Sequence, residues 1–268
     1  MKFKLILILI LTFIFGGCFK KSDIQEIDSF KEAQTILATV DPQSLIIFDI
    51  DETLLSPADV PFQSWFFSSK RGKAFTEKAA QRVRDFKNIV IEPSIIDIIQ
   101  NLENRKIKTI ALTYCDTGAF GGGIIPSLPQ WRYEDLKKEG IDFSPSFGDQ
   151  EIIFEHLTSK ANRHPMFYKG ILLTDAFSKG EILGAFLDRV NWKPSNVIFF
   201  DDRLNYLESV EEEMKKRGIP FKGYLYKGAQ HLPRKIDKEI LDIELQHLKE
   251  HDEFISDEEA REKPSFPT

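Results

Sequence analysis

Short apolar runs alternate with helical patterns along most of the chain. Between the runs, apolar residues recur at helical spacing after Pro93 and again from Ile182 to Val190. Strands that alternate with helices predict right-handed crossovers and a parallel sheet covered on both faces. The runs expected to be strands are Leu45–Phe48, Thr109–Leu112, Ile171–Leu173, Val197–Phe200 and Phe221–Tyr226. The pattern predicts an α/β fold with a three-layer, Rossmann-like core at residues 45–248 and a ligand site beyond the carboxyl ends of the strands.

Two insertions interrupt this core. Residues 54–92 follow the first apolar run and include a predicted helix at 73–86, preceded by the aromatic cluster Trp65–Phe67. We expect this segment to form a small helical cap over the site. Residues 142–168 combine apolar positions with turn residues and are expected to form a hairpin-like excursion.

Both ends of the chain differ from the core. In residues 18–44, apolar positions from Ile24 to Leu37 recur at helical spacing, which predicts an N-terminal helical arm. Residues 249–268 are charged, poor in large apolar side chains and end in prolines. Such a composition predicts a disordered tail.

The first seventeen residues have the features of a signal peptide. Two lysines precede the apolar run Leu5–Phe15, which is too short for a permanent transmembrane helix. Two glycines stand directly before Cys18, as in bacterial lipoprotein signals, where this cysteine carries the lipid. Phe15 replaces the usual leucine, which leaves soluble secretion as an alternative. We expect a membrane-anchored lipoprotein that faces the periplasm or the cell surface.

Composition and charge narrow the class of protein. The 268 residues are 42% hydrophobic and 29% charged, which is typical of a globular protein. The net charge of −6 gives no general basic face and argues against a nucleic-acid partner. Removal of residues 1–17 leaves 34 basic and 42 acidic residues. A lipid on Cys18 would leave Cys115 as the only free thiol, so no internal disulfide could form.

Acidic residues follow the first predicted strand. Asp49, Asp51 and Thr53 occupy alternate positions after the apolar run, and both carboxylates can face one site. This spacing resembles the first motif of the haloacid-dehalogenase-like (HAD) hydrolases. The resemblance implies that Asp49 is the nucleophile toward phosphorus, that Asp51 is the general acid and base, and that Thr53 holds this loop at the phosphate site.

The remaining motifs of that superfamily have counterparts in the same order. Thr113 ends the second run, Lys179 opens a helical pattern, and Asp201 and Asp202 follow the fourth run. The resemblance implies that Thr113 and Lys179 bind the phosphoryl oxygens. Lys160 and Lys169 are weaker candidates, because Lys169 precedes its strand. The implied Mg²⁺ ligands, all hard oxygens, are Asp49, the main-chain carbonyl of Asp51, Asp201 and Asp202.

Other phosphate and metal sites fit the sequence less well. An EF-hand starting at Asp49 lacks the required glycine and the final glutamate, and the chain has no P-loop motif. A receiver domain would carry its acid pair and its phosphorylated aspartate in the opposite order. The five histidines show no metal-ligand spacing, and the glycines at 118–123 are assigned to a loop without a role.

Within the HAD superfamily, the chain resembles the acid-phosphatase-like or the uncharacterised bacterial members that have small caps. We expect a Mg²⁺-dependent phosphomonoester hydrolase that acts on a phosphorylated small molecule through an aspartyl-phosphate. Two alternatives stay open: a phosphotransferase with an acceptor other than water, and a lipid-anchored binding protein that keeps the fold with little catalysis. Cap shape decides the substrate in such enzymes, and the sequence does not reveal that shape.

Overall fold

A computed structural model describes residues 22–58, 80, 83–84, 87–232, 238–251 and 253–263. The predicted signal peptide with Cys18, most of the predicted helix at 73–86 and the aromatic cluster Trp65–Phe67 lie outside the described residues.

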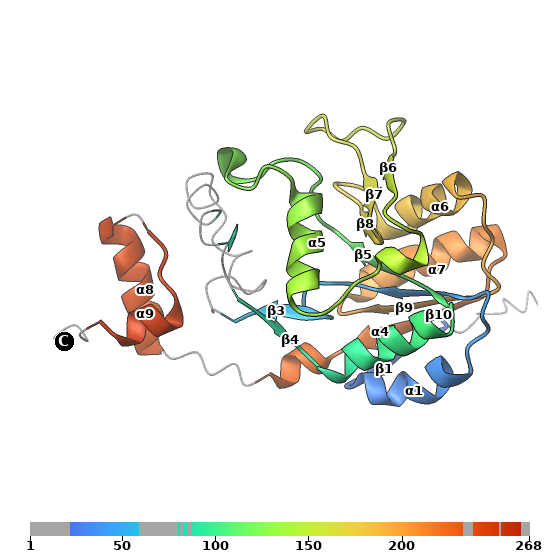
Figure 1. Cartoon of the computed structure of the whole chain (residues 1–268), viewed down its shortest axis with the longest axis horizontal. Helices are drawn as coiled ribbons and strands as arrows, with labels where there is room; N and C mark the ends of the chain where they lie inside the picture. Colours follow the sequence, from blue (N-terminus) through green and yellow to red (C-terminus); the bar gives the residue numbers. More distant parts are fainter. Residues whose placement is uncertain are drawn as a thin grey trace, which may run out of the picture.

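The centre of the molecule is an eight-stranded, mostly parallel sheet (Figure 1). All five predicted strands are present. The first six strands in the spatial order are mutually parallel, and the last two are antiparallel to their neighbours. In spatial order the strands are β1 (Ile24–Ile27), β10 (Phe221–Tyr226), β9 (Val197–Asp201), β2 (Leu45–Phe48), β5 (Lys108–Thr113), β8 (Ile171–Leu173), β7 (Met166–Tyr168) and β6 (Glu151–Ile153).

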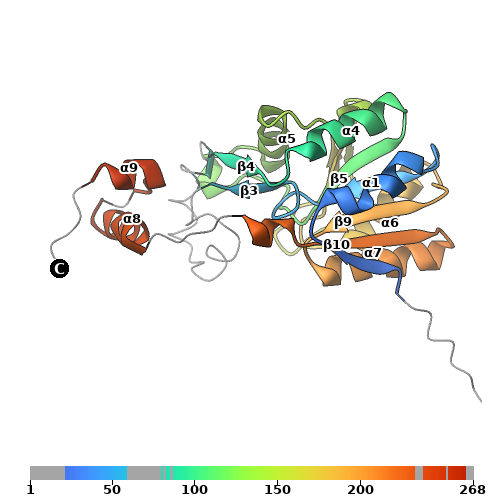
Figure 2. The same ribbon diagram turned by 90° about the horizontal axis from the view of Figure 1, so that it is seen from below.

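Helices cover both faces of this sheet and complete three layers (Figures 1 and 2). One face carries α1 (Phe30–Thr39), α4 (Ser94–Asn104) and α5 (Leu128–Lys138); the other carries α6 (Lys179–Arg189) and α7 (Leu204–Arg217). Two separate apolar clusters fill the space between the layers. The short 3-10 turns are η2 (Gly121–Gly123), η3 (Ser144–Ser146) and η4 (Gly228–His231). The α/β architecture and both helices expected after Pro93 and around Ile182 are confirmed.

Close packing of α6 on α7 fixes the start of α6. A Cβ at Gly180 would overlap the main chain of Ser209, so only glycine allows this approach. The main-chain N–H of Gly180 also donates to Ser209 Oγ at 3.2 Å. The neighbouring Lys179 is thereby held at the carboxyl edge of the sheet.

The N-terminal arm was predicted wrongly in part. Residues 24–27 form an edge strand that pairs in parallel with β10, and the helix begins only at Phe30. Ile27 packs in the cluster of one face and Ile24 against that of the other, as an odd separation on a strand requires. Ser29 and Glu32 form a capping box that starts the helix. The apolar spacing also fitted a helix, because Ile27 comes three positions after Ile24, and residues three apart share one face of a helix.

The two insertions begin and end in strands. β3 (Leu55–Pro57) and β4 (Asn88–Val90) form an antiparallel pair at the two ends of the predicted cap. Residues 142–168 contain the predicted hairpin, β6 and β7, but it is not an excursion from the core. It continues the main sheet beside β8, where main-chain pairing satisfies its backbone groups.

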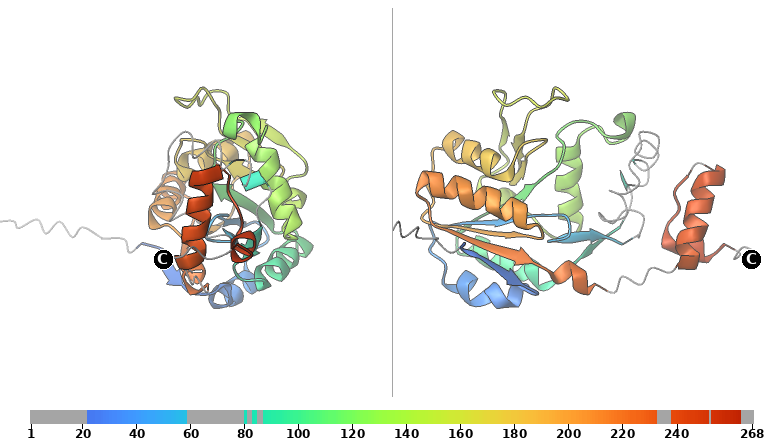
Figure 3. Two further views of the ribbon diagram at one scale, coloured as in Figure 1. Left: turned by 90° about the vertical axis from the view of Figure 1, so that its left-hand side faces the viewer. Right: turned by 180° about the vertical axis from the view of Figure 1, so that it is seen from behind.

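Part of the predicted disordered tail, residues 249–251 and 257–261, is helical. α8 (Lys238–His251) and α9 (Asp257–Arg261) pack on each other through Ile240, Ile243, Ile255 and Ala260. A capping box of Ser256 and Glu259 starts α9. This helix pair lies apart from the sheet (Figure 3). Among the described residues, no helix is both long enough and apolar enough to cross a membrane.

Candidate active site

The carboxyl ends of β2 and β9 define the site. The chain passes from β2 to β5 and β8 on one side, then returns to β9 and β10 on the other. The strand order therefore reverses between β2 and β9, which is where parallel α/β sheets bind ligands. Asp49 directly follows β2, and Asp201 ends β9. The Asp49 N–H donates to Phe200 O at 2.9 Å and ties the two strand ends together.

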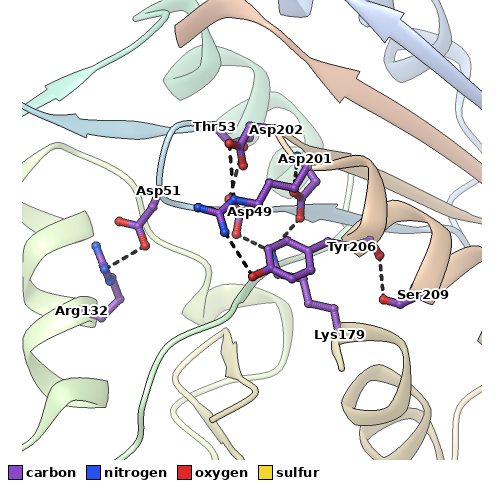
Figure 4. Close-up of polar contacts among 10 residues, drawn as sticks. Asp49, Asp51, Thr53, Arg132, Lys179, Asp201, Asp202, Tyr206 and Ser209 are labelled. Carbon is purple, nitrogen blue, oxygen red and sulfur yellow. Dashed lines mark hydrogen bonds and ion pairs between the residues drawn. The ribbon is translucent and has the colours of Figure 1, made fainter. Parts of the chain in front are cut away.

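A buried lysine joins the two strand ends. Lys179, the first residue of α6, has no exposed surface, and its Nζ donates to Asp49 Oδ1 and, at 2.7 Å, to Asp201 Oδ2 (Figure 4). Burial alone would lower the pKa of Lys179, but the charges of Asp201 and Asp49 outweigh it and raise the pKa. Lys179 therefore stays charged and balances part of the acidic charge.

Three carboxylates converge at this point. Asp49, Asp201 and Asp202 each offer one oxygen, and these oxygens lie within 4.8 Å of one another. Burial raises the pKa of Asp201 to about 8 and that of Asp202 to about 7, and nearby Asp49 adds to both shifts. Burial also raises the pKa of Asp49, against the charge of Lys179. Crowded carboxylates with raised pKa values are short of positive charge, as expected of a cation site.

A tight turn after β2 presents Asp49. The N–H groups of Thr53, Leu54 and Leu55 all donate to Ile50 O, at 2.9 to 3.3 Å. Glu52 has a φ of 64°, a left-handed conformation that closes the turn, and its Oε1 accepts a 3.1 Å bond from Ser56 Oγ. Thr53 Oγ1 donates to Asp49 Oδ2 at 3.4 Å. Thr53 thus holds the Asp49 carboxylate from inside the turn.

Asp51 and Thr113 lie beside the acidic cluster. The Asp51 carboxylate is 47% exposed and turns away from Asp49 to meet Arg132 of α5 (Figure 4). Thr113 is buried at the end of β5, two residues beyond Ala111, which pairs with Phe48 of β2. Thr113 therefore lies at the same height along the strands as the turn that carries the acids.

A family model described as "Protein of unknown function (DUF2608)" matches residues 26–261. The chain belongs to this family. The match starts within β1 and ends at the last residue of α9. It therefore includes the sheet, every candidate site residue and the C-terminal helix pair.

Relatives of this DUF2608 chain occur in two bacterial genera. A Rickettsia felis protein is 36% identical over 145 residues, which cover 53% of this chain and 49% of that protein. A Rickettsia typhi protein is 28% identical over an alignment of 297 residues that covers 100% of this chain and 98% of the relative. Both are named "Uncharacterized protein". A Chlamydia trachomatis protein, 23% identical over 70% of each chain, is named "Putative outer membrane protein".

Sequence reasoning missed several side chains that surround the acids in this DUF2608 chain. Tyr206 of α7 lies over Lys179, with Nζ 4.6 Å from the ring centroid, and stacks on half-exposed Tyr114 at 5.8 Å. Arg203 donates to the Tyr206 hydroxyl at 3.5 Å. The positions of two of these residues in the sequence could have identified them, because Tyr114 directly follows Thr113 and Arg203 directly follows Asp202. Arg132 had no such signal, because it lies in a helix whose pattern shows no special feature.

Proposed function

We propose that this chain is a Mg²⁺-dependent phosphomonoester hydrolase of the HAD type that forms an aspartyl-phosphate on Asp49. The observation that carries the proposal is the convergence of Asp49, Asp201 and Asp202 within 4.8 Å beside a buried lysine. The order of β2, β5, Lys179 and β9 along the chain, and the meeting of their ends at one edge, also agree with the motif order of that superfamily.

The donor set fits a hard divalent cation. All three side chains offer carboxylate oxygens, and Lys179 alone does not balance them. Asp49, Asp201 and Asp202 would hold Mg²⁺, together with the main-chain carbonyl of Asp51. Bound there, Mg²⁺ would supply positive charge that offsets the repulsion between a phosphate dianion and the carboxylates.

The side chains then divide the reaction between them. Asp49 Oδ attacks phosphorus, and the bond from phosphorus to the leaving oxygen breaks while Asp51 gives that oxygen a proton. In the second step Asp51 takes a proton from water, whose oxygen bonds to phosphorus and releases Asp49. Thr53 keeps the Asp49 carboxylate oriented, and Lys179 and Thr113 hold the phosphoryl oxygens.

The low exposure of the site favours one alternative function. Asp49 is only 5% exposed and Tyr206 lies over Lys179, as expected of a binding protein that keeps the fold without efficient turnover. The open side of the site argues for catalysis, because the Asp51 carboxylate is 47% exposed and that of Asp202 is 23% exposed.

The proposal is tested by measuring phosphate release from a broad panel of phosphomonoesters. The full chain is purified in detergent and assayed with Mg²⁺ or with EDTA. We expect Mg²⁺-dependent turnover that Asp49→Asn abolishes, because it removes the nucleophile, and that Asp201→Asn lowers by at least about 100-fold, because it removes a charge from the cluster. Full Mg²⁺-dependent turnover in either variant would contradict it. Silence of a folded, Mg²⁺-bound protein would favour the binding protein, and transfer of phosphate to added alcohol would reveal a phosphotransferase.

We also propose that the chain is exported and anchored by a lipid on Cys18. The order of basic, apolar and small residues before Cys18 supports this, as does the name of the chlamydial relative, "Putative outer membrane protein".

A further inference from the structure

A buried arginine contacts the exposed acid of the site. Arg132 lies on α5, and its side chain is only 9% exposed. Its Nη2 donates to Asp51 Oδ2 at 3.1 Å, while the Asp51 carboxylate itself is 47% exposed (Figure 4). The arginine is thus inside the protein and the carboxylate at the opening. Arg132 holds Oδ2 of Asp51, and the carboxylate is exposed enough for a ligand to reach it.

The guanidinium of Arg132 is itself fixed from the far side. Its Nη1 contacts Asp135 Oδ2 at 3.4 Å, and the other oxygen of Asp135 accepts a 2.7 Å bond from Asn88 Nδ2. Asn88 is the first residue of β4, where the chain returns from the predicted cap. A row of polar contacts therefore runs from the base of that insertion to Asp51.

Acids on both sides offset the cost of burying this arginine. Burial alone would lower the pKa of Arg132, but the charges of Asp51, Cys115 and Asp135 outweigh it and raise the pKa. Arg132 is therefore a buried cation that is paired with the acid of the site. The planar guanidinium can fix the direction of a carboxylate, which a flexible ammonium does poorly.

We propose that Arg132 is a positioning residue that aims Asp51 at the leaving group of the substrate. The proposal rests on the hydrolysis proposed above. In that reaction Asp51 passes its proton to the ester oxygen as the bond to phosphorus breaks, and later takes one from the attacking water. Arg132 keeps all its protons throughout and takes no part in the proton transfer itself.

The benefit of a fixed general acid depends on the leaving group of the ester. An acidic phenol leaves phosphorus without help, whereas an alkoxide needs a proton as the bond breaks. Loss of Arg132 should therefore matter most for phosphate esters of aliphatic alcohols.

The test compares two leaving groups in the full-length protein. We expect Arg132→Met to lower kcat/KM about 100-fold on glycerol 1-phosphate and less than about fivefold on p-nitrophenyl phosphate, because only the first ester needs the acid. The loss on glycerol 1-phosphate should lie in kcat. Arg132→Lys keeps the charge and should recover part of the activity. Asp51→Asn should show the same selectivity, and adding Arg132→Met to it should cost nothing further.

Arg217→Met is the matched control. Arg217 also pairs with two acids, Asp188 and Glu213, but it does so between α6 and the last turn of α7, so its loss should leave the ratio between the two substrates unchanged. A folded Arg132→Met variant that loses kcat/KM equally on both substrates, or only through KM, would overturn the role proposed for Arg132. The proposed function would stand. A wild-type protein without Asp49-dependent phosphate release from any ester of the broad panel would overturn the proposed function, and this inference with it.

Discussion

Lys179 balances the charge of the acids at the level of single residues. Its Nζ contacts Asp49 and Asp201, and all three side chains are buried. Lys179→Met would leave two buried carboxylates without a cation, a change that typically costs about 3 kcal/mol. We expect this loss in the free energy of unfolding in EDTA, measured with urea at pH 7. Mg²⁺ should restore part of it, because binding to the folded state is stabilising.

The exposed Lys216, which pairs with Glu212, provides the control for this measurement. Lys216→Met should leave the urea midpoint unchanged, because exposed ion pairs contribute little. Equal stability of Lys179→Met and the wild type in EDTA would show that Lys179 does not carry the charge balance.

Cys115 lies two residues beyond Thr113 and could be mistaken for the nucleophile. Burial raises the pKa of its thiol to about 11, although the nearby Arg132 opposes the shift. We expect iodoacetamide at pH 8 to alkylate Cys115 at least about tenfold more slowly than free cysteine, since little thiolate is present. The rate should keep rising up to about pH 11. Mass spectrometry of the Cys115 peptide measures it, and fast alkylation at pH 7 with loss of turnover would instead point to a reactive thiol.

At the level of elements, one carboxylate attaches the N-terminal segment to the sheet. Glu92 accepts hydrogen bonds from Ser29 Oγ at 2.8 Å, from Phe30 N at 2.9 Å and from Tyr226 OH at 3.3 Å. It thus caps α1 and joins it to β10. Glu92→Ala leaves these donors unpaired and should lower the free energy of unfolding by about 2 kcal/mol, measured with urea. Turnover of the folded variant should be unchanged, whereas a loss of turnover without a loss of stability would contradict this structural role.

The sequence predicts the elements whose pattern fits one structure only. Buried strands such as β2 and β9 are continuous apolar runs, and the acids after them come directly from the order of the chain. β1 was missed because two isoleucines three residues apart fit either a helix or an edge strand, and only the free edge of β10 decides between them. Pairing between distant segments cannot be read from local spacing.

Candidate site residues divide in the same way. Asp49, Lys179 and Asp201 were found because each opens or closes an element whose end lies at one edge of the sheet. The direction of the Asp51 side chain was not predicted, because Arg132 lies 81 residues further along the chain and reaches Asp51 through the packing of α5. Contacts of this kind depend on how a helix is rotated on its sheet, which a single sequence does not specify.

At the scale of the whole molecule, the described residues form an α/β core and a separate C-terminal helix pair. The core clusters on the two faces of the sheet do not include α8 or α9, which have a cluster of their own. The candidate site lies at the carboxyl ends of the strands. The N-terminal strand β1 is the outermost strand of the sheet, beside β10. An anchor before residue 22 would therefore attach through the strand most distant from the β6–β7 hairpin.

Cys18→Ser tests the proposed anchor. If the cysteine carries a lipid, the wild-type chain should fractionate with membranes and take up labelled fatty acid, because two or more acyl chains bind a bilayer stably. The variant should lose the label and leave the membrane fraction after its signal is cleaved. Its candidate site should be unchanged, since Cys18 precedes every element of the fold. Two results together would contradict this: a variant that still fractionates with membranes, and a wild type that takes up no labelled fatty acid. They would show that the apolar run Leu5–Phe15 is itself the anchor.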